Sequence, residues 1–254
     1  MPRALVVGID YAGTAMELSG CANDAHAMAA HLTKRGYAVT LLSDAVESEL
    51  STAVPPTRAN ILRALAELIL APDNDLVFTY SGHGAQLPDL DGDEADGLDE
   101  VLVPLDAARG LTHDTAIIDD ALRGLLQMLR EPQRLACILD CCHSGSGLDL
   151  KWVGHVQGGR LRLLDGGERP TPGQCVMLSG CRDDQVSLER TVRGQTHGVL
   201  TAAVLACLTT APGLSASDLF FRVRASLRRA GEEQTPQISA GRKTRLTEPF
   251  FPKK

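Results

Sequence analysis

Leu76-Val-Phe-Thr-Tyr80 and Leu135-Ala-Cys-Ile-Leu139 are the two apolar runs around which the predicted fold is built. Short continuous apolar runs bounded by turn residues are typical of strands buried on both faces. Each run leads into a polar turn, Ser81-Gly-His-Gly84 in the first case and Asp140-Cys-Cys142 in the second. Because functional groups in a parallel sheet gather beyond the carboxyl ends of the strands, both turns are candidate sites.

Strand and helix signals alternate on either side of these runs. We expect further strands over residues 5–9, 38–42, 176–179 and 236–239, and helices from Asn23 or Asp24, after the cap Thr57, from Asp119 or Asp120, and over 198–208 and 215–229. Alternating elements imply right-handed crossovers and a mainly parallel sheet with helices on both faces. The fold class is therefore α/β, in one domain over residues 1–254.

The segment 151–173 is rich in glycine and basic residues and is predicted to be a long exposed loop. It separates a first part, residues 1–150, which carries both candidate turns, from a second part, residues 174–254.

Composition excludes several classes of protein. The 254 residues are 44% apolar and 22% charged, with a net charge of −7 and 4% aromatic residues. An acidic chain poor in aromatic residues is unlike a nucleic-acid binder. No apolar run approaches the roughly 20 residues of a membrane helix. The seven cysteines form no CxxC pair, which argues against a disulfide framework or zinc knuckle, so we expect a cytoplasmic protein without membrane association.

A cysteine and a histidine end the two deciding strands. A thiol becomes a useful nucleophile when a base takes its proton. Cys142 and His83 would face one crevice if their strands are neighbours, and they lie 142 − 83 = 59 residues apart. Spacing alone leaves open a buried structural cysteine and a structural histidine.

Six short motifs in order resemble those of the metacaspases, caspase-like cysteine peptidases of prokaryotes, protists, fungi and plants. They are Gly20–Asp24, Tyr80–Gly84, Gly92–Asp106, Ile117–Asp120, Asp140–Gly145 and Gln234–Ser239, and they span nearly the whole chain. The resemblance implies a caspase-like fold, with a six-stranded mainly parallel sheet between helices. It also identifies the first part as large-subunit-like and the second as small-subunit-like.

The resemblance implies acyl transfer by a dyad of His83 and Cys142, without a third triad residue. The backbone N–H groups of Gly84 and Cys142 would form the oxyanion hole. The chain begins at its first strand, so it is expected to be a short form without a prodomain. Caspases dimerise through a sheet edge whereas metacaspases are usually monomeric, and the residues do not decide between the two.

Four residues fall on metacaspase positions that line the pocket for the residue before the cut: Cys21, Asp24, Ser81 and Asp140. Carboxylates accept a guanidinium in bidentate fashion and repel acidic side chains, so we expect protein or peptide substrates cut after Arg or Lys. A structural alternative for Asp24 is a helix N-cap, and for Asp140 a backbone-bonding turn residue.

The acidic run Asp89–Glu100 packs seven acids into twelve residues. It is not an EF-hand, because Glu94 occupies the position of the invariant glycine and a strand precedes the run. A solvated acidic loop is the simpler interpretation. The resemblance instead implies a Ca²⁺ site at Asp99, Asp119, Asp120 and Asp149, where the ion would order the loops around the crevice.

Two other functions stay open at this stage. A caspase-like interaction module with little activity is disfavoured by the presence of both His83 and Cys142. A legumain-like peptidase with a different specificity would lack the paired acids. The expected function is a calcium-dependent cysteine endopeptidase.

Overall fold

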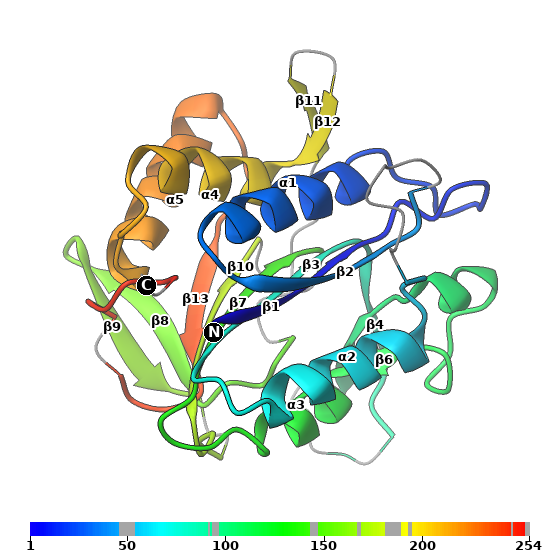
Figure 1. Cartoon of the computed structure of the whole chain (residues 1–254), viewed down its shortest axis with the longest axis horizontal. Coiled ribbons are helices and arrows are strands. Elements are labelled where there is room, and N and C mark those ends of the chain that lie inside the picture. The colour runs from blue at the N-terminus through cyan, green and yellow to red at the C-terminus, as the bar shows by residue number, and fades with distance from the viewer. Residues whose placement is uncertain are drawn as a thin grey trace.

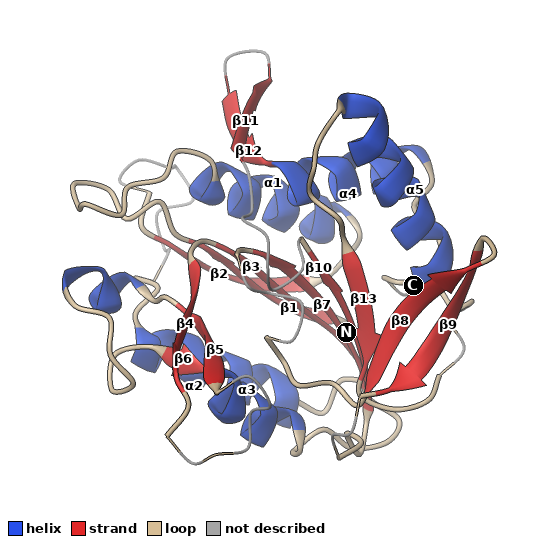
Figure 2. Cartoon of the chain, turned by 180° about the vertical axis from the view of Figure 1, so that it is seen from behind, coloured by secondary structure: helices blue, strands red, loops and turns tan. Residues whose placement is uncertain are grey.

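The structure is a computed structural model that describes residues 1–45, 54–90, 92, 97–142, 147–166, 169–180, 189–192, 195–244 and 246–251. An eight-stranded sheet forms the middle of the molecule (Figures 1 and 2). In spatial order its strands are β2 (Ala38–Ser43), β1 (Arg3–Gly8), β3 (Asp75–Ser81), β7 (Arg134–Asp140), β10 (Gln174–Ser179), β13 (Gln237–Ala240), β8 (Trp152–Gln157) and β9 (Arg160–Asp165).

The first five strands of this order are parallel, and β13 joins antiparallel to β10. These six strands confirm the expected mainly parallel sheet, but the predicted number of six strands is too low, because β8 and β9 extend the sheet to eight. Strands β3 and β7 are neighbours at its centre, as the two deciding apolar runs require.

Helices cover both faces of the sheet, as Figure 2 shows. One face carries α1 (Cys21–Lys34), α4 (Val199–Thr210) and α5 (Ala216–Ala230), and the other carries α2 (Arg58–Leu70) and α3 (Asp119–Leu126). Side chains along β3 alternate between the two cores, so that Val77 packs under α1 and α4 while Phe78 and Tyr80 pack with α2. This alternation follows from the two-residue period of a strand. None of the described helices is both long and apolar enough to cross a membrane.

Three smaller groups of elements lie outside the main sheet. A three-stranded sheet contains β4 (Gly84–Pro88), β5 (Leu98–Leu102) and β6 (Ile117–Ile118), and a 3₁₀ helix covers Leu105–Arg109. The strands β11 (Glu189–Val192) and β12 (Gln195–Gly198) form a separate pair that leads directly into α4. Since β4 starts one residue after His83, the three-stranded sheet adjoins one of the two candidate turns.

The prediction of a long loop over residues 151–173 is wrong, because most of this segment forms a β-hairpin. β8 and β9 pair antiparallel along their whole lengths, and Val153 of β8 pairs with Ser239 of β13. Gly158 and Gly159, which connect them, both have positive φ, 57° and 74°. A two-residue type I′ hairpin turn requires two consecutive residues with positive φ. The Gly158-Gly159 pair is therefore the sequence signal that predicts this hairpin. Much of the hairpin is nevertheless exposed.

The start of α1 also differs from the expectation. The helix begins at Cys21 after Gly20, and neither Asn23 nor Asp24 caps it. Its first N–H groups are capped by a residue outside the helix, because Asp10 Oδ1 accepts hydrogen bonds from Cys21 N at 2.8 Å and from Ala22 N at 3.1 Å. For α2 the predicted cap is confirmed, because the Thr57 side chain accepts from Asn60 N.

Gly8 allows β1 and α1 to approach closely. A Cβ at Gly8 would lie 2.3 Å from Cys21 O and 2.5 Å from Ala25 Cβ. We expect Gly8→Ala to lower the free energy of unfolding by about 1–3 kcal/mol through overpacking, measured by urea denaturation. Gly124→Ala is the control: Gly124 is an exposed position of α3 with open space around it, and alanine there should add about 0.5–1 kcal/mol. Equal stabilities for the two variants would contradict the close contact.

Candidate active site

His83 and Cys142 lie just beyond the carboxyl ends of two neighbouring strands. β3 and β7 pair in parallel up to Ser81 and Asp140, which face each other as the last pair. His83 and Cys142 each follow two residues later, so both leave the sheet at the same end. Gly82 N–H donates to Asp140 O at 3.4 Å and extends the contact past that pair.

Gly84 and Cys142 are in direct main-chain contact. A Cβ at Gly84 would lie 2.0 Å from Cys142 O, a distance that no real side chain tolerates. The glycine is therefore required for the two turns to meet. The N–H groups expected to form an oxyanion hole belong to these two touching segments.

The imidazole of His83 is held by main-chain and aromatic groups. Its Nε2 lies 2.8 Å from Met16 O. Because a carbonyl oxygen only accepts hydrogen bonds, this contact assigns the proton of the neutral ring to Nε2 and leaves Nδ1 as the basic nitrogen. The partner of Nε2 is a main-chain carbonyl and not the side chain of a third residue. Such a group has no residue type by which the sequence could reveal it.

Cys142 is partly exposed, whereas the other cysteines in the described part of the chain are buried. Its neighbour Cys141 is 1% exposed and belongs to the core on the α2 side. Exposure is one requirement of a reactive thiol, because a thiol buried in apolar surroundings stays protonated and inert.

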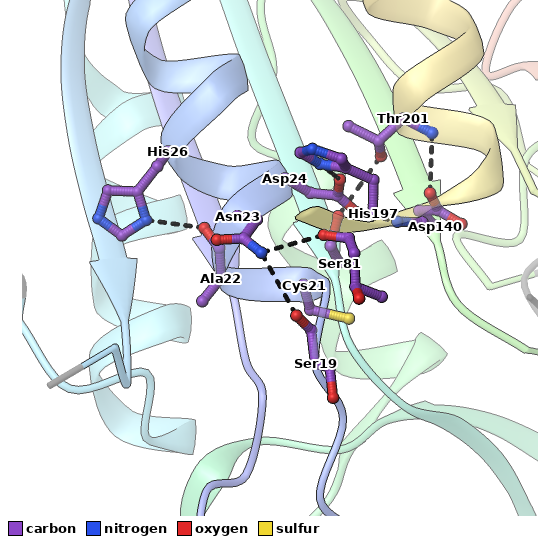
Figure 3. Close-up of polar contacts among 12 residues, drawn as sticks. Ser19, Cys21, Ala22, Asn23, Asp24, His26, Ser81, Asp140, His197 and Thr201 are labelled. Carbon is purple, nitrogen blue, oxygen red and sulfur yellow. Dashed lines mark hydrogen bonds and ion pairs between the residues drawn. The ribbon is translucent and has the colours of Figure 1, made fainter. Parts of the chain in front are cut away.

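The two predicted pocket acids, Asp24 and Asp140, converge on the start of α4 (Figure 3). Asp24 Oδ2 accepts from Gly198 N at 2.8 Å, and Asp140 Oδ2 accepts from Thr201 N at 2.8 Å. A Cβ at Gly198 would lie within 2.4 Å of Asp140 Oδ2 and 2.6 Å of Asp24 Oδ2, so both carboxylates lie against this one glycine.

These contacts give both acids a structural role. α4 has no side-chain cap of its own, and its first N–H groups would otherwise be orphaned. Asp140 thus bonds backbone as its structural alternative predicted, while Asp24 serves α4 and not its own helix. Asp24 is 0% exposed and Asp140 is 4% exposed, and both lie at the N-terminus of α4, where the helix dipole favours negative charge.

His197 and Thr201 were not identified from the sequence. His197 Nδ1 lies 3.1 Å from Asp24 Oδ1, and Thr201 Oγ1 lies 3.5 Å from Ser81 Oγ. The available signal is the helix start His197-Gly-Val-Leu-Thr201. It has no Ser, Thr, Asp or Asn at its cap, which leaves its first N–H groups to water or to acceptors from elsewhere in the chain.

Cys21 and Ser81, the other two predicted pocket residues, border the same region and are 4% and 5% exposed. Figure 3 shows both near Asp24, with Cys21 at the first turn of α1. All four predicted pocket residues therefore come from the start of α1 and the ends of β3 and β7.

The four residues expected to bind Ca²⁺ lie on three separate segments. Asp99 is on β5, Asp119 and Asp120 begin α3, and Asp149 lies after Cys142 with a positive φ of 43°. Asp119 links two of these elements, because its Oδ2 accepts from Glu100 N at 2.8 Å.

Acidic groups crowd around Asp119. Burial raises the pKa of the Asp119 carboxyl to about 7. Two smaller effects oppose each other. The hydrogen bonds that Asp119 accepts from the N–H groups of Asp120 and Glu100 lower this pKa, and the nearby carboxylates of Glu100 and Asp99 raise it. His113 Nε2 lies 3.4 Å from Asp99 Oδ2. Asp91 and residues 93–96 of the acidic run fall outside the described residues.

Comparison with solved structures defines the class of fold. The crystal structure of a Geobacter sulfurreducens protein matches with a TM-score of 0.70 and 25% sequence identity, covering 100% of this chain and 99% of that one. Caspase-1 from Spodoptera frugiperda matches with a TM-score of 0.58 at 14% identity, covering 94% of this chain and 85% of that one. The expected caspase-like fold is confirmed.

Comparison with sequences defines the family. Residues 2–151 match the family described as metacaspase, peptidase C14 domain. Metacaspase-1A of Aspergillus clavatus is 34% identical over 288 residues, covering 93% of this chain and 65% of that protein. Metacaspase-1 of Coccidioides immitis is also 34% identical over 288 residues, covering 93% of this chain and 61% of its own length. The chain belongs to the metacaspase family, and it spans just under two thirds of the length of these curated relatives.

The structural role of Asp140 can be separated from its charge. Asp140→Ala removes the acceptor of Thr201 N–H and should lower the free energy of unfolding by about 1–3 kcal/mol, measured by urea denaturation. Asp140→Asn keeps an acceptor oxygen and should recover most of that loss. An alanine variant as stable as the wild type would show that the carboxylate does not cap α4.

Proposed function

We propose that this chain is a cysteine endopeptidase in which Cys142 is the nucleophile and His83 the general base. The observation that carries the proposal is the register of β3 and β7, which delivers both side chains to one end of the sheet. The partial exposure of Cys142 and the carbonyl contact that orients His83 support it.

The reaction proceeds by acyl transfer. His83 Nδ1 takes the proton of the Cys142 thiol, and the thiolate attacks the carbonyl carbon of the scissile peptide bond. The negative oxygen that forms is stabilised by the N–H groups of Gly84 and Cys142. The intermediate collapses to a thioester as the imidazolium gives its proton to the leaving amine. Water, deprotonated by the same imidazole, then hydrolyses the thioester and restores the thiol.

The proposed substrates have Arg or Lys before the cut. Asp24 and Asp140 are two carboxylates within one small region beside the strand ends, and a guanidinium or ammonium group is their natural ligand. Both carboxylates are nearly closed to solvent, and His197 lies against Asp24. A substrate side chain that reaches Asp24 would therefore share this carboxylate with His197 or displace the imidazole.

Peptides with Arg, Lys, Asp or Asn before the cut test the mechanism and the specificity together. With Ca²⁺ supplied, we expect cleavage after Arg and Lys alone, and a loss of kcat on the order of 10³-fold or more in Cys142→Ala. Cys207→Ala, at a buried cysteine of α4, should retain full activity.

Asp140→Asn should fold and yet lose at least about tenfold in kcat/KM for Arg peptides, because the charge-assisted bond is lost. Cleavage after Asp or Asn would overturn the specificity. An inactive wild type whose Cys142 reacts no faster with iodoacetamide than a buried thiol would overturn the proposed activity.

We further propose that Ca²⁺ binds at Asp99 and Asp119, with Asp120 and Asp149 completing the ligand set. Buried carboxylates that crowd one another fit a hard cation, which prefers oxygen ligands and would relieve the repulsion. In the described part of the chain, however, no three acidic, cysteine or histidine side chains are already gathered as a metal site. When bound, the ion would supply positive charge that ties β5 to α3.

Calcium binding is measurable without peptidase activity. We expect isothermal titration calorimetry to detect a site and millimolar Ca²⁺ to raise the Tm, since a ligand that binds only the folded state stabilises it. Asp119→Asn should weaken binding at least tenfold, whereas Asp114→Asn, at an exposed position, should not. Unchanged affinity in Asp119→Asn would place the ion elsewhere, and full peptidase activity in excess chelator would contradict calcium dependence.

A further inference from the structure

Two buried tyrosines lie beneath the turn that carries His83. Tyr11 follows β1, Tyr80 belongs to β3, and both are 0% exposed. Their hydroxyl oxygens are 3.2 Å apart. Gly82 packs on the pair, because a Cβ there would lie 2.8 Å from the Tyr80 hydroxyl and 2.9 Å from that of Tyr11. The turn thus rests directly on two hydroxyl groups.

The two hydroxyls bind opposite ends of the same residue. His83 N donates to Tyr11 Oη at 2.9 Å, and Tyr80 Oη donates to His83 O at 2.9 Å. Both hydroxyls also lie within hydrogen-bonding distance of Val103 O: Tyr11 Oη is 2.6 Å from it and Tyr80 Oη is 2.9 Å from it. Burial raises the pKa of each tyrosine far above the neutral range, so both keep their protons.

The contributions of the two tyrosines are not equal. His83 O also accepts from Val103 N at 3.1 Å, so it keeps a partner when the Tyr80 hydroxyl is removed. The His83 N–H makes its hydrogen bond to the Tyr11 hydroxyl. A buried donor that loses its acceptor costs more than an acceptor that keeps a second donor.

Tyr11 also touches the imidazole and organises the loop that contacts it. The Tyr11 and His83 rings lie 4.9 Å apart between centroids. Thr14 Oγ1 donates to Tyr11 O at 2.8 Å and accepts from Met16 N at 3.1 Å, and Met16 O lies on His83 Nε2. Tyr11 itself has a φ of 53°, which is unusual for a residue with a side chain and is maintained only by surrounding contacts.

We propose that Tyr11 is a positioning residue for His83: its hydroxyl fixes the histidine main chain, its ring packs on the imidazole, and its carbonyl, through Thr14, sets the Met16 carbonyl on Nε2. The proposal rests on the proposed function, in which His83 is the base. In this role Tyr11 acts on the reaction through the position of His83.

The test compares Tyr11→Phe with Tyr80→Phe and with Tyr37→Phe in the full chain. Tyr37 is a buried tyrosine that packs on Phe251 next to the start of β2, at the opposite end of the parallel strands from His83. It controls for the general cost of losing a buried hydroxyl. The measurements are kcat and KM on an Arg peptide, the pH dependence of Cys142 alkylation by iodoacetamide, and stability in urea.

We expect Tyr11→Phe to lower kcat on the order of tenfold with KM within twofold of the wild type, because a freely moving imidazole spends less time near the thiol. The midpoint of Cys142 alkylation should move to higher pH, since a poorly held imidazolium stabilises the thiolate less. Tyr80→Phe should change kcat by less than about threefold, and Tyr37→Phe should match the wild type in both kinetic measurements.

Thr14→Val provides a second route should Tyr11→Phe not fold. It removes the hydroxyl between Tyr11 O and Met16 N from a half-buried loop position and should shift the alkylation midpoint in the same direction, while Thr14→Ser should restore it. Wild-type alkylation profiles in both Tyr11→Phe and Thr14→Val would overturn the proposal, as would equal kinetic losses in Tyr11→Phe and Tyr37→Phe. A wild-type Cys142 that reacts as slowly as a buried thiol would instead overturn the dyad, and this inference with it.

Discussion

Pairing between β3 and β7 decides where every proposed functional group on these strands points. Side chains alternate along a strand, so the register places Ser81 and Asp140 on the face covered by α4 and places Tyr80 and Cys141 on the opposite face. A slip of one residue would exchange the faces of one strand only. Asp140 would then lose its hydrogen bond to the start of α4, and the two turns that carry His83 and Cys142 would no longer meet.

The start of α4 explains why two carboxylates are stable inside the protein. A buried carboxylate without partners is strongly disfavoured. Here Gly198 N and Thr201 N each donate to one of the acids, and the positive end of the helix dipole adds a favourable field. The same arrangement holds the two acids near one another, which is the condition for binding a cationic substrate group in the proposed function. A structural cap and a binding group are therefore compatible roles for one side chain.

The surroundings of His83 show how much of a site can consist of main chain. Met16 O contacts its ring, Val103 N contacts its carbonyl oxygen, and Gly84 is required because Cys142 O lies so close. These contacts are made by main-chain atoms, so no side-chain type marks them in the sequence. The tyrosine hydroxyls are the side-chain part of the arrangement, and they act on the backbone of the histidine.

Local pattern was sufficient for the α/β class, the central strands, the Thr57 cap and the family motifs, because each depends on residues near one another in the chain. It failed where the partner is remote. α1 is capped by Asp10, and α4 is capped by Asp24 and Asp140, which lie 174 and 61 residues from the amides that they bind. The hairpin at 152–165 was not predicted for a different reason, because its turn signal, Gly158-Gly159, is local and was not recognised. The sequence by itself thus determined which residue types are available at the strand ends. Only the tertiary structure decided which of them meet, since hydrogen bonds and charges act over a few ångströms of space regardless of how many residues separate the groups.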